Sequence, residues 1–144
     1  PPTPQRRKAA AALARGIEAN VRRDFKEFHG EISYLLADSR FITGPRISQV
    51  PRNQGSARLS YQHKRTLASA GVRSFSSQFE DDLNLFVLPG FATVQAEVSQ
   101  QLTKSVTVRA AFENLLDRQY VVGFSPTPHI GSPRAGRPGV KWSL

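Results

Sequence analysis

The sequence predicts an all-β protein, an antiparallel segment of a transmembrane β-barrel with about seven strands. Three observations favour this fold class. Segments of roughly ten residues alternate between apolar and polar side chains, which is the period of a strand with one apolar face. The connections between these segments are alternately short and long. Within the segments, most charged side chains fall on the face opposite the apolar one.

Composition narrows the alternatives. The 144 residues include no cysteine, which excludes a disulfide scaffold and a thiolate zinc site. No run of about 20 apolar residues occurs, so a membrane-spanning helix is excluded, whereas a barrel with alternating strands is not. The opening stretch lacks an initiator Met and the leucine-rich core of a secretory signal, so we expect a processed product or a piece of a longer chain. The net charge is +9, and it is heaviest early, at Arg6, Arg7, Lys8, Arg15, Arg22 and Arg23.

The first alternating segment supports two interpretations. From Gly16 to Phe25, apolar and polar residues alternate as in a strand. Apolar residues also recur four apart, at Leu13, Ile17, Val21 and Phe25, so residues 9–25 fit a basic amphipathic helix equally well. We expect residues 16–144 to form the barrel part. Residues 1–15 are expected to be a basic, alanine-rich leader whose structure the sequence leaves open.

The next three strands follow with one long connection among them. A short turn at Lys26 and Glu27 leads to a second strand at residues 28–37. The long connection comprises residues 38–53. The third strand, residues 55–63, turns sharply at "KRT" into the fourth, residues 67–76. Along these strands the side chains opposite the apolar face include Glu31, Ser33, Arg58, Ser60, Ser69 and Arg73.

The remaining strands repeat the pattern. Residues 77–90 form a second long connection, which contains the acidic run Glu80-Asp81-Asp82. The fifth strand is expected at residues 91–101 and the sixth, "VTVRAAFE", at residues 106–113, with a short turn at Thr103 and Lys104 between them. A third long connection spans residues 117–134, and the chain closes on a strand at residues 137–144.

The lengths of the connections orient the expected sheet. In outer-membrane barrels short turns face the periplasm and long loops face outward, and the assignment here is self-consistent throughout. An Arg or Lys at the lipid midplane costs about 2–4 kcal/mol, which favours placing Arg58, Arg73 and Arg109 on a wet inner face. Polar-in, apolar-out is the inverse of a soluble domain.

The closing octet has a second regularity, Arg137-x-Gly139-x-x-Trp142-x-Leu144. Alternating apolar residues share one face there, and an indole can lie at the bilayer interface. The octet resembles the C-terminal signal of bacterial outer-membrane barrels, although the final residue in that family is usually Phe. The resemblance implies that the barrel assembly machinery recognises this strand.

The stretch "FENLLDRQY", residues 112–120, resembles the "N-L-F-D-x-x-Y" motif of TonB-dependent receptors. Asn114, Leu115, Asp117 and Tyr120 match, and Leu116 replaces the usual Phe. In that family the motif leads from the penultimate strand into the last external loop. Asn and Asp favour turns because their side chains bond to nearby backbone groups, so we expect a structural role. Tyr120 is expected to be an interfacial anchor.

Four other stretches are similar to the same family in the same order. They are "ARGIEANV", "VPRNQGSARLSY", "LPGFATVQAEVSQQLT" and "GSPRAGRPGVKWSL", the last with Gly131, Pro133 and Arg134 at matching positions. Together the stretches cover nearly all of residues 15–144. The chain therefore resembles the C-terminal portion of a TonB-dependent receptor barrel.

That resemblance implies a barrel of about 22 strands, of which this chain supplies roughly the last third without the plug domain. It also implies a Gram-negative-type outer membrane and TonB-driven uptake of a scarce ligand, such as siderophore–iron or cobalamin. The implied partners are outer-membrane lipid, the rest of the barrel and its plug, TonB through the missing N-terminal part, and the assembly machinery. Two open sheet edges are not tolerated in hydrocarbon, so the chain alone is not expected to transport. Ligand contacts are expected in the three long connections and on the wet face, with no individual residue identified.

No motif predicts an enzyme or a cofactor. His29, His63 and His129 lack metal-ligand spacing, and the acidic run lacks the ligand spacing of a calcium loop. No glycine-rich phosphate loop or nucleophile elbow is present. The alternative function is a soluble, basic all-β module that binds nucleic acid through aromatic residues on a sheet. Most Phe residues lie in loops or at strand ends, so we expect no nucleic-acid partner.

Overall fold

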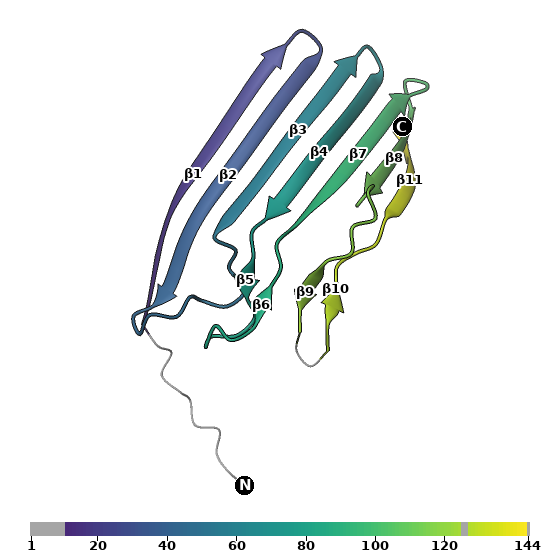
Figure 1. Ribbon diagram of the computed structural model, residues 1–144. Helices are drawn as coiled ribbons and strands as arrows, with labels where there is room; N and C mark the ends of the chain where they lie inside the picture. Colours follow the sequence, from purple (N-terminus) through teal and green to yellow (C-terminus); the bar gives the residue numbers. More distant parts are fainter. Residues whose placement is uncertain (1–10, 125–126, 144) are drawn as a thin grey trace.

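The computed structural model describes residues 11–124 and 127–143, and a seven-stranded antiparallel sheet dominates them (Figure 1). Its strands, in spatial order, are β1 (Ala12–Phe25), β2 (Phe28–Phe41), β3 (Asn53–His63), β4 (Thr66–Phe75), β7 (Phe91–Gln101), β8 (Val106–Glu113) and β11 (Ala135–Trp142). The predicted all-β barrel segment with about seven strands is confirmed. In the described part of the chain, no helix is long and apolar enough to cross a membrane.

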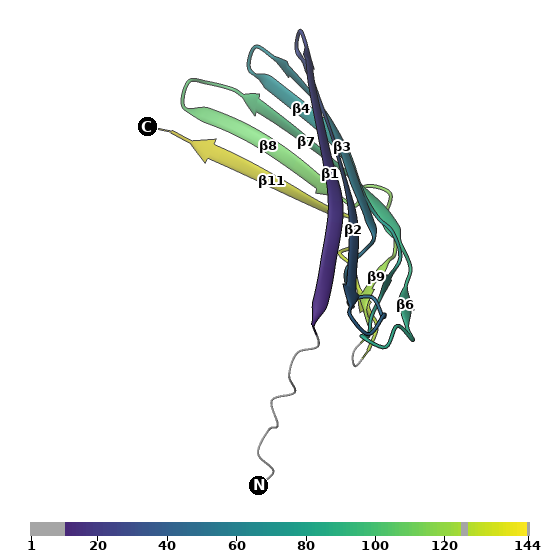
Figure 2. The same cartoon turned by 90° about the vertical axis from the view of Figure 1, so that its left-hand side faces the viewer.

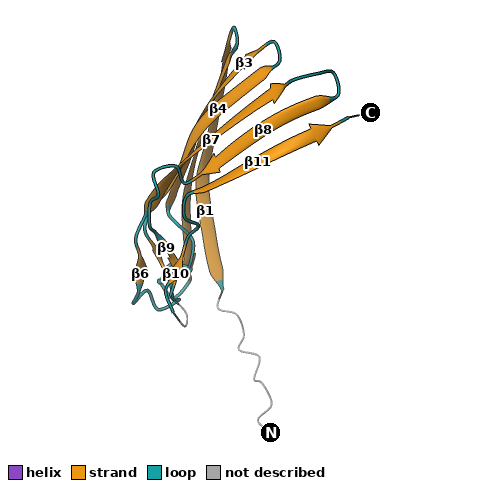
Figure 3. Cartoon of the chain, turned by 90° about the vertical axis from the view of Figure 1, so that its right-hand side faces the viewer, coloured by secondary structure: helices purple, strands orange, loops and turns teal. Residues whose placement is uncertain are grey.

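The sheet is open. Each of its strands pairs with the next one along the chain, so the topology is a meander, and β1 and β11 are the two edges. Views from the two sides show a twisted, curved wall that does not close on itself (Figures 2 and 3). Twist of this kind follows from the handedness of the strands themselves.

The first segment is a strand. β1 begins at Ala12, four positions earlier than predicted, and pairs with β2 along its whole length. The helical interpretation of residues 9–25 is therefore wrong for the residues that are described, whereas residues 1–10 lie outside them. A side chain at Gly16 would lie 2.6 Å from the carbonyl oxygen of Leu36, so this position of the pairing requires glycine.

Short turns lie at one end of the sheet and long connections at the other, as predicted (Figure 1). Lys26 and Lys64 adopt left-handed backbone with φ of 52° and 50°, which lets the first two turns stay tight. The first long connection is shorter than expected, because β2 continues to Phe41 and β3 begins at Asn53. The other two contain hairpins that the sequence did not reveal, β5 (Gln78–Phe79) with β6 (Val87–Leu88) and β9 (Val121–Gly123) with β10 (His129–Ile130).

The large sheet has two chemically different faces and almost no core of its own. The register aligns apolar residues in rows such as Val21–Ile32–Ala57–Val72–Val94. Many are exposed, Ile17 by 67% and Val21 by 61%, whereas the described hydrophobic residue that is fully buried, Leu88, lies in a loop hairpin. Apolar surface left in water costs about 25 cal/mol per Å², so this face needs an apolar surrounding. We call it the lipid-facing side.

Charged residues on the lipid-facing side of β1 and β2 stand near the ends of the apolar band. On β1, Arg15 lies toward the long connections and Arg23 toward the short turns. Eight residues separate them, which is roughly 26 Å along a strand at about 3.3 Å per residue. Since barrel strands tilt by about 40°, the charge-free band is roughly 20 Å tall along the membrane normal, about 5 Å less than the usual apolar band, so both arginines lie near its rims.

Candidate functional site: the hydrated face and the loop cluster

The face opposite the lipid-facing side carries the polar and charged residues of the strands. We call it the hydrated face, and its polar residues include Glu18, Asn20, Arg22, Glu31, Ser33, Ser56, Arg58, Ser69, Arg73, Gln95, Glu97, Arg109, Glu113 and Arg137. Alternation along each strand places them there, and the antiparallel register sets opposite charges beside one another.

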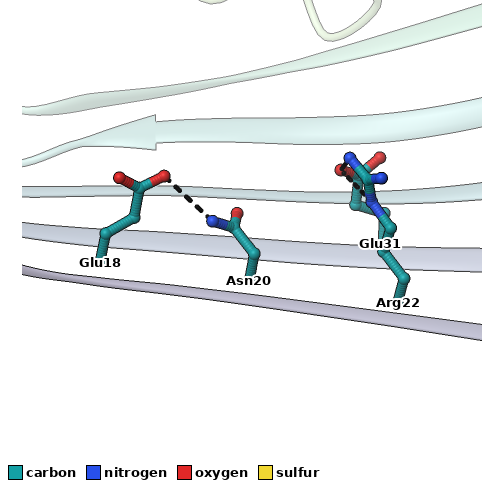
Figure 4. A network of polar contacts seen from close by, with 4 residues as sticks. All are labelled: Glu18, Asn20, Arg22 and Glu31. Atoms are coloured by element: carbon teal, nitrogen blue, oxygen red, sulfur yellow. Dashed lines mark hydrogen bonds and ion pairs between the residues drawn. The ribbon is translucent and has the colours of Figure 1, made fainter.

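The clearest network joins β1 to β2 (Figure 4). Arg22 and Glu31 are direct cross-strand partners, and Nε and Nη2 of Arg22 both donate to Oε1 of Glu31, at 3.1 and 3.0 Å. Further along β1, the amide of Asn20 donates to Glu18 at 3.0 Å. Both members of the ion pair are exposed, so it contributes at most about 1 kcal/mol and mainly fixes the two side chains in place.

Hydrogen bonds between polar side chains also occur further across the hydrated face. Arg73 donates to the side-chain oxygen of Gln95 at 3.3 Å, and Arg137 donates to Glu113 at 3.2 Å. A hollow of about 430 Å³ lies between Glu31, Ser56, Arg58, Arg73 and Gln95. These groups offer hydrogen-bond donors and acceptors to water or to a neighbouring polar surface. The arrangement suits the inner wall of an aqueous lumen.

The described residues of the long connections form one loop cluster, which consists of residues 42–52, 76–90, 114–124 and 127–134. Glu80 joins all three parts. Its Oε2 accepts a hydrogen bond from the side chain of Gln49 at 3.2 Å, and its Oε1 accepts one from the backbone N–H of Phe124 at 3.0 Å. The β6 and β9 segments also lie against each other, as Figures 1 and 3 show. A single carboxylate thus links segments that are far apart in the sequence.

The first two connections are tied at two more points. Ser48 donates from its hydroxyl to Asp82 at 2.6 Å. The backbone N–H of Arg46 donates to the side-chain oxygen of Asn84 at 2.6 Å, and the Asn84 amide donates back to the Arg46 carbonyl at 2.8 Å. These bonds fix the loop after β2 on the turn between β5 and β6.

Asp81 shapes that turn by capping its backbone. Its carboxylate accepts hydrogen bonds from the N–H groups of Phe86, Leu85 and Leu83, at 2.8 to 3.2 Å. The bond from Phe86, with those from Leu85 and Leu83, holds the pKa of Asp81 below its ordinary value. The acidic run therefore has a structural role, because its three carboxylates accept hydrogen bonds that hold the loops in place. Among the described residues, no group of three or more His, Cys, Asp or Glu side chains could hold a metal ion.

The predicted motif residues Asn114, Leu115 and Asp117 are brought together where β8 ends. Asn114 is 4% exposed and has φ of 48°; its amide donates to the carbonyls of Arg118 and Ser132, and its oxygen accepts from the N–H of Arg118. Asp117 accepts from the N–H of Arg134 at 3.0 Å, and the N–H of Leu115 donates to Val94. The motif closes the base of the last long connection.

Tyr120 lies in the same connection and packs on aromatic neighbours. Its ring stacks on Phe91 with centroids 4.1 Å apart, and Phe91 lies 5.1 Å from Phe75. Gly131 packs so closely on this ring that any side chain at residue 131 would overlap it. Phe75 and Phe91 belong to the hydrated face, so Tyr120 is on that side, away from the surface where an interfacial anchor would lie.

The predicted residues of the closing octet lie on β11, apart from the motif above. Arg137 pairs with Glu113 on the hydrated face, and the side chain of Arg109 crosses Gly139. Trp142 is 71% exposed and lies on the lipid-facing side near the short turns. Leu144 lies outside the described residues.

Sequence reasoning missed the aromatic row and the role of Glu80. By the aromatic row we mean Phe75, Phe91 and Tyr120, whose rings contact one another. The sequence does indicate part of it, because Phe75 and Phe91 stand on either side of the second long connection and become neighbours if the flanking strands pair. No sequence pattern indicated the role of Glu80. Its partners lie in loops, and the alternation of apolar and polar residues along strands does not determine where loops lie.

Residues 2–115 match the family described as TonB dependent receptor-like, beta-barrel. The chain belongs to this family. The predicted resemblance is thereby confirmed, and with it an outer-membrane location in a Gram-negative-type cell. No curated protein matches the sequence.

Solved TonB-dependent siderophore receptors share the fold of this family member. The ferric citrate transporter FecA in its unliganded form matches 90% of this chain with a TM-score of 0.83 and 18% identity, over 24% of its own chain. BauA, the ferric preacinetobactin receptor from Acinetobacter baumannii, matches 91% with 0.78 and 21% identity, over 22% of its own chain. The ferripyoverdine receptor of Pseudomonas aeruginosa, bound to ferripyoverdine, matches 91% with 0.75 and 20% identity, over 19% of its own chain.

At these identities the likeness establishes the fold, and the chain spans only 19% to 24% of the length of these three structures. The family and its structural neighbours are transport receptors. Neither gives support to the nucleic-acid alternative.

Proposed function

We propose that this TonB-dependent receptor chain is the C-terminal part of a barrel that takes up a scarce ligand, of the siderophore–iron or cobalamin class. The observation that carries the proposal is the match of its open sheet to siderophore receptors over 90% to 91% of the chain. The two chemically distinct faces support it, because a lumen wall needs one wet side and one side in contact with lipid.

The open edges of the sheet bear on how the chain works. The outer edges of β1 and β11 carry backbone groups without a strand partner. Each unsatisfied group costs several kcal/mol in hydrocarbon. The proposal is therefore that further strands of the barrel complete the wall, and that the chain alone does not transport.

The proposed partners follow from this architecture. A plug fills the lumen against the hydrated face, and TonB acts through the part of the receptor that precedes this chain. The barrel assembly machinery recognises the closing octet, residues 137–144, through Arg137, Gly139, Trp142 and Leu144. The barrel part includes residues 12–15 as well as those expected from the sequence, because β1 begins at Ala12 and pairs with β2 from there.

The proposed ligand contacts lie in the loop cluster and the adjoining hydrated face. Glu80, Asp82 and Asn84 hold three loops together on the side that faces outward in outer-membrane barrels. Such a joined surface presents a fixed set of polar groups to an arriving solute. Pre-organised loops lose less conformational entropy when a ligand binds.

Uptake by living cells tests the proposal. The complete receptor that contains this chain is produced in cells lacking their other ferric-siderophore receptors. Radiolabelled ferric citrate, a ferric hydroxamate, a ferric catecholate and cobalamin are supplied in turn. We expect accumulation of one of them that disappears when TonB is deleted or the proton gradient is collapsed. If none accumulates, or if accumulation is indifferent to TonB, the proposal is wrong.

A further inference from the structure

The lipid-facing side contains an apolar groove. Small residues alternate with larger ones across neighbouring strands there, since Leu59 lies between Gly30 and Ala70, and Ile32 pairs with Ala57. The resulting groove has a volume of about 490 Å³ and a floor of Gly30, Ala57 and Ala70 between the larger Val21, Ile32 and Leu59. A gap of this kind leaves its walls without van der Waals partners unless something fills it.

One end of the groove is cationic. Arg23 is among the residues that line it, and its cross-strand partner is Gly30, which has no side chain to cover it. Within residues 11–124 and 127–143, Arg23 makes no ion pair. The adjoining turns add Lys26, Lys64 and Arg65, all of them exposed.

The opposite end of the same face has a different charge balance. Arg15 has Asp38 as its direct cross-strand partner. The carboxylate of Asp38 also accepts a hydrogen bond from Arg40 at 2.8 Å. At the end near the long connections, Asp38 therefore supplies a carboxylate beside Arg15 and Arg40. At the end near the short turns, Arg23 has no such ion-pair partner among the described residues.

Aromatic residues place Arg23 at the depth of lipid headgroups. Phe25, which is 66% exposed, pairs with Phe28, and Phe28 lies 5.0 Å from Tyr61. Lys26 lies over the Phe25 ring, 5.5 Å from its centroid. Aromatic belts of this kind mark the membrane–water interface, and a long basic side chain at that level extends toward the phosphates.

We propose that this groove binds one anionic phospholipid of the periplasmic leaflet, with an acyl chain over Gly30, Ala57 and Ala70 and the phosphate at Arg23 and Lys26. The proposal rests on the barrel orientation given above and not on any transported ligand. Charge complementarity favours a lipid over a second protein chain, because a packed protein surface would have to supply a carboxylate to a desolvated Arg23.

Native mass spectrometry tests the site on the complete receptor, titrated with phosphatidylglycerol or phosphatidylethanolamine of equal chain length. We expect one phosphatidylglycerol to bind above the statistical distribution, about fivefold more tightly than phosphatidylethanolamine. Arg23→Gln should abolish that preference. Ala70→Leu, which fills the groove, should weaken binding of both lipids.

Two matched variants on β1 serve as controls. Arg15→Gln removes a positive charge from the same face at the other rim, and Ala19→Leu enlarges a lipid-facing side chain outside the groove; both should leave binding unchanged. If Ala70→Leu fails to give a heat-modifiable barrel on a gel, Ala57→Val replaces it.

Equal binding of the two headgroups, a purely statistical distribution of lipids, a dimer mass in place of a lipid, or equal effects of Arg23→Gln and Arg15→Gln would overturn the inference. If any of these results is obtained while the receptor still takes up its ligand in the cell assay, the lipid site is refuted and the proposed receptor function is not. A complete wild-type receptor that forms no heat-modifiable barrel would refute the proposed receptor as well.

Discussion

Asn114 and Asp117 each join the start of the last long connection to its end. Asn114 reaches the carbonyl of Ser132, and Asp117 accepts from the N–H of Arg134. Residue type alone predicted that both would favour a turn, because Asn and Asp bond to nearby backbone. It could not predict partners so distant in the sequence, since these depend on where the returning segment lies.

Gly131→Ala should disturb the loop cluster more than an ordinary surface change. The added methyl group would overlap the ring of Tyr120, which must then leave its stack on Phe91. We expect a loss of about 1–3 kcal/mol in stability. The measurement is the temperature at which the barrel loses its compact migration on gels. Gly30→Ala, whose methyl group would lie 3.7 Å from the carbonyl oxygen of Arg23, is the control and should change little.

Asp81 should make the turn between β5 and β6 sensitive to acid. Because the hydrogen bond from Phe86, with those from Leu85 and Leu83, lowers the folded pKa, the carboxylate stabilises the turn above its ordinary pKa. That contribution is lost as pH falls through the lowered folded value. We expect Asp81→Asn to speed hydrogen exchange of residues 83–86 at neutral pH and to remove its dependence on acid. Unchanged exchange in the variant would contradict this role.

At the scale of the element, β1 shows why one segment had two interpretations. Residues four apart share a face in a helix and also in a strand, so Ile17, Val21 and Phe25 fit both periods. Pairing with β2 decides, because it supplies hydrogen-bond partners to the inner edge of β1 over its whole length from Ala12 to Phe25. That information lies in the neighbouring strand and not in the segment. Hairpins β5–β6 and β9–β10 escaped prediction because two or three residues are too few to show a period.

Neighbouring residues on β4 test the assignment of the two faces. Ala70 belongs to the lipid-facing side, whereas Ser69 belongs to the hydrated face between Ser60 and Glu97. Ala70→Arg should cost about 2–4 kcal/mol, the penalty for Arg near the bilayer midplane. Ser69→Arg should be close to neutral, with Glu97 beside it. Denaturant unfolding from lipid vesicles gives both values, and a reversed order would mean that the faces have been exchanged.

At the scale of the whole molecule, the sequence predicted the meander because one physical constraint repeats in every strand. Each strand must present apolar side chains to lipid and polar ones to water. This requirement is directly visible in the sequence as an alternation of apolar and polar residues. The loop cluster obeys no repeating rule. Its contacts, such as those of Glu80 with Gln49 and Phe124, depend on the three-dimensional positions of separate connections.

The number of strands in the sheet has a consequence for assembly. Seven antiparallel strands is an odd number, so β1 and β11 run in the same direction. If these two edges met, they would form a parallel pair, unlike every other pair in the wall, and two copies inserted the same way up would face the same mismatch. An antiparallel ring built on this piece therefore admits only an odd number of additional strands. The odd number of strands therefore excludes a fully antiparallel ring made by this piece alone or by its direct edge-to-edge pairing with a second copy.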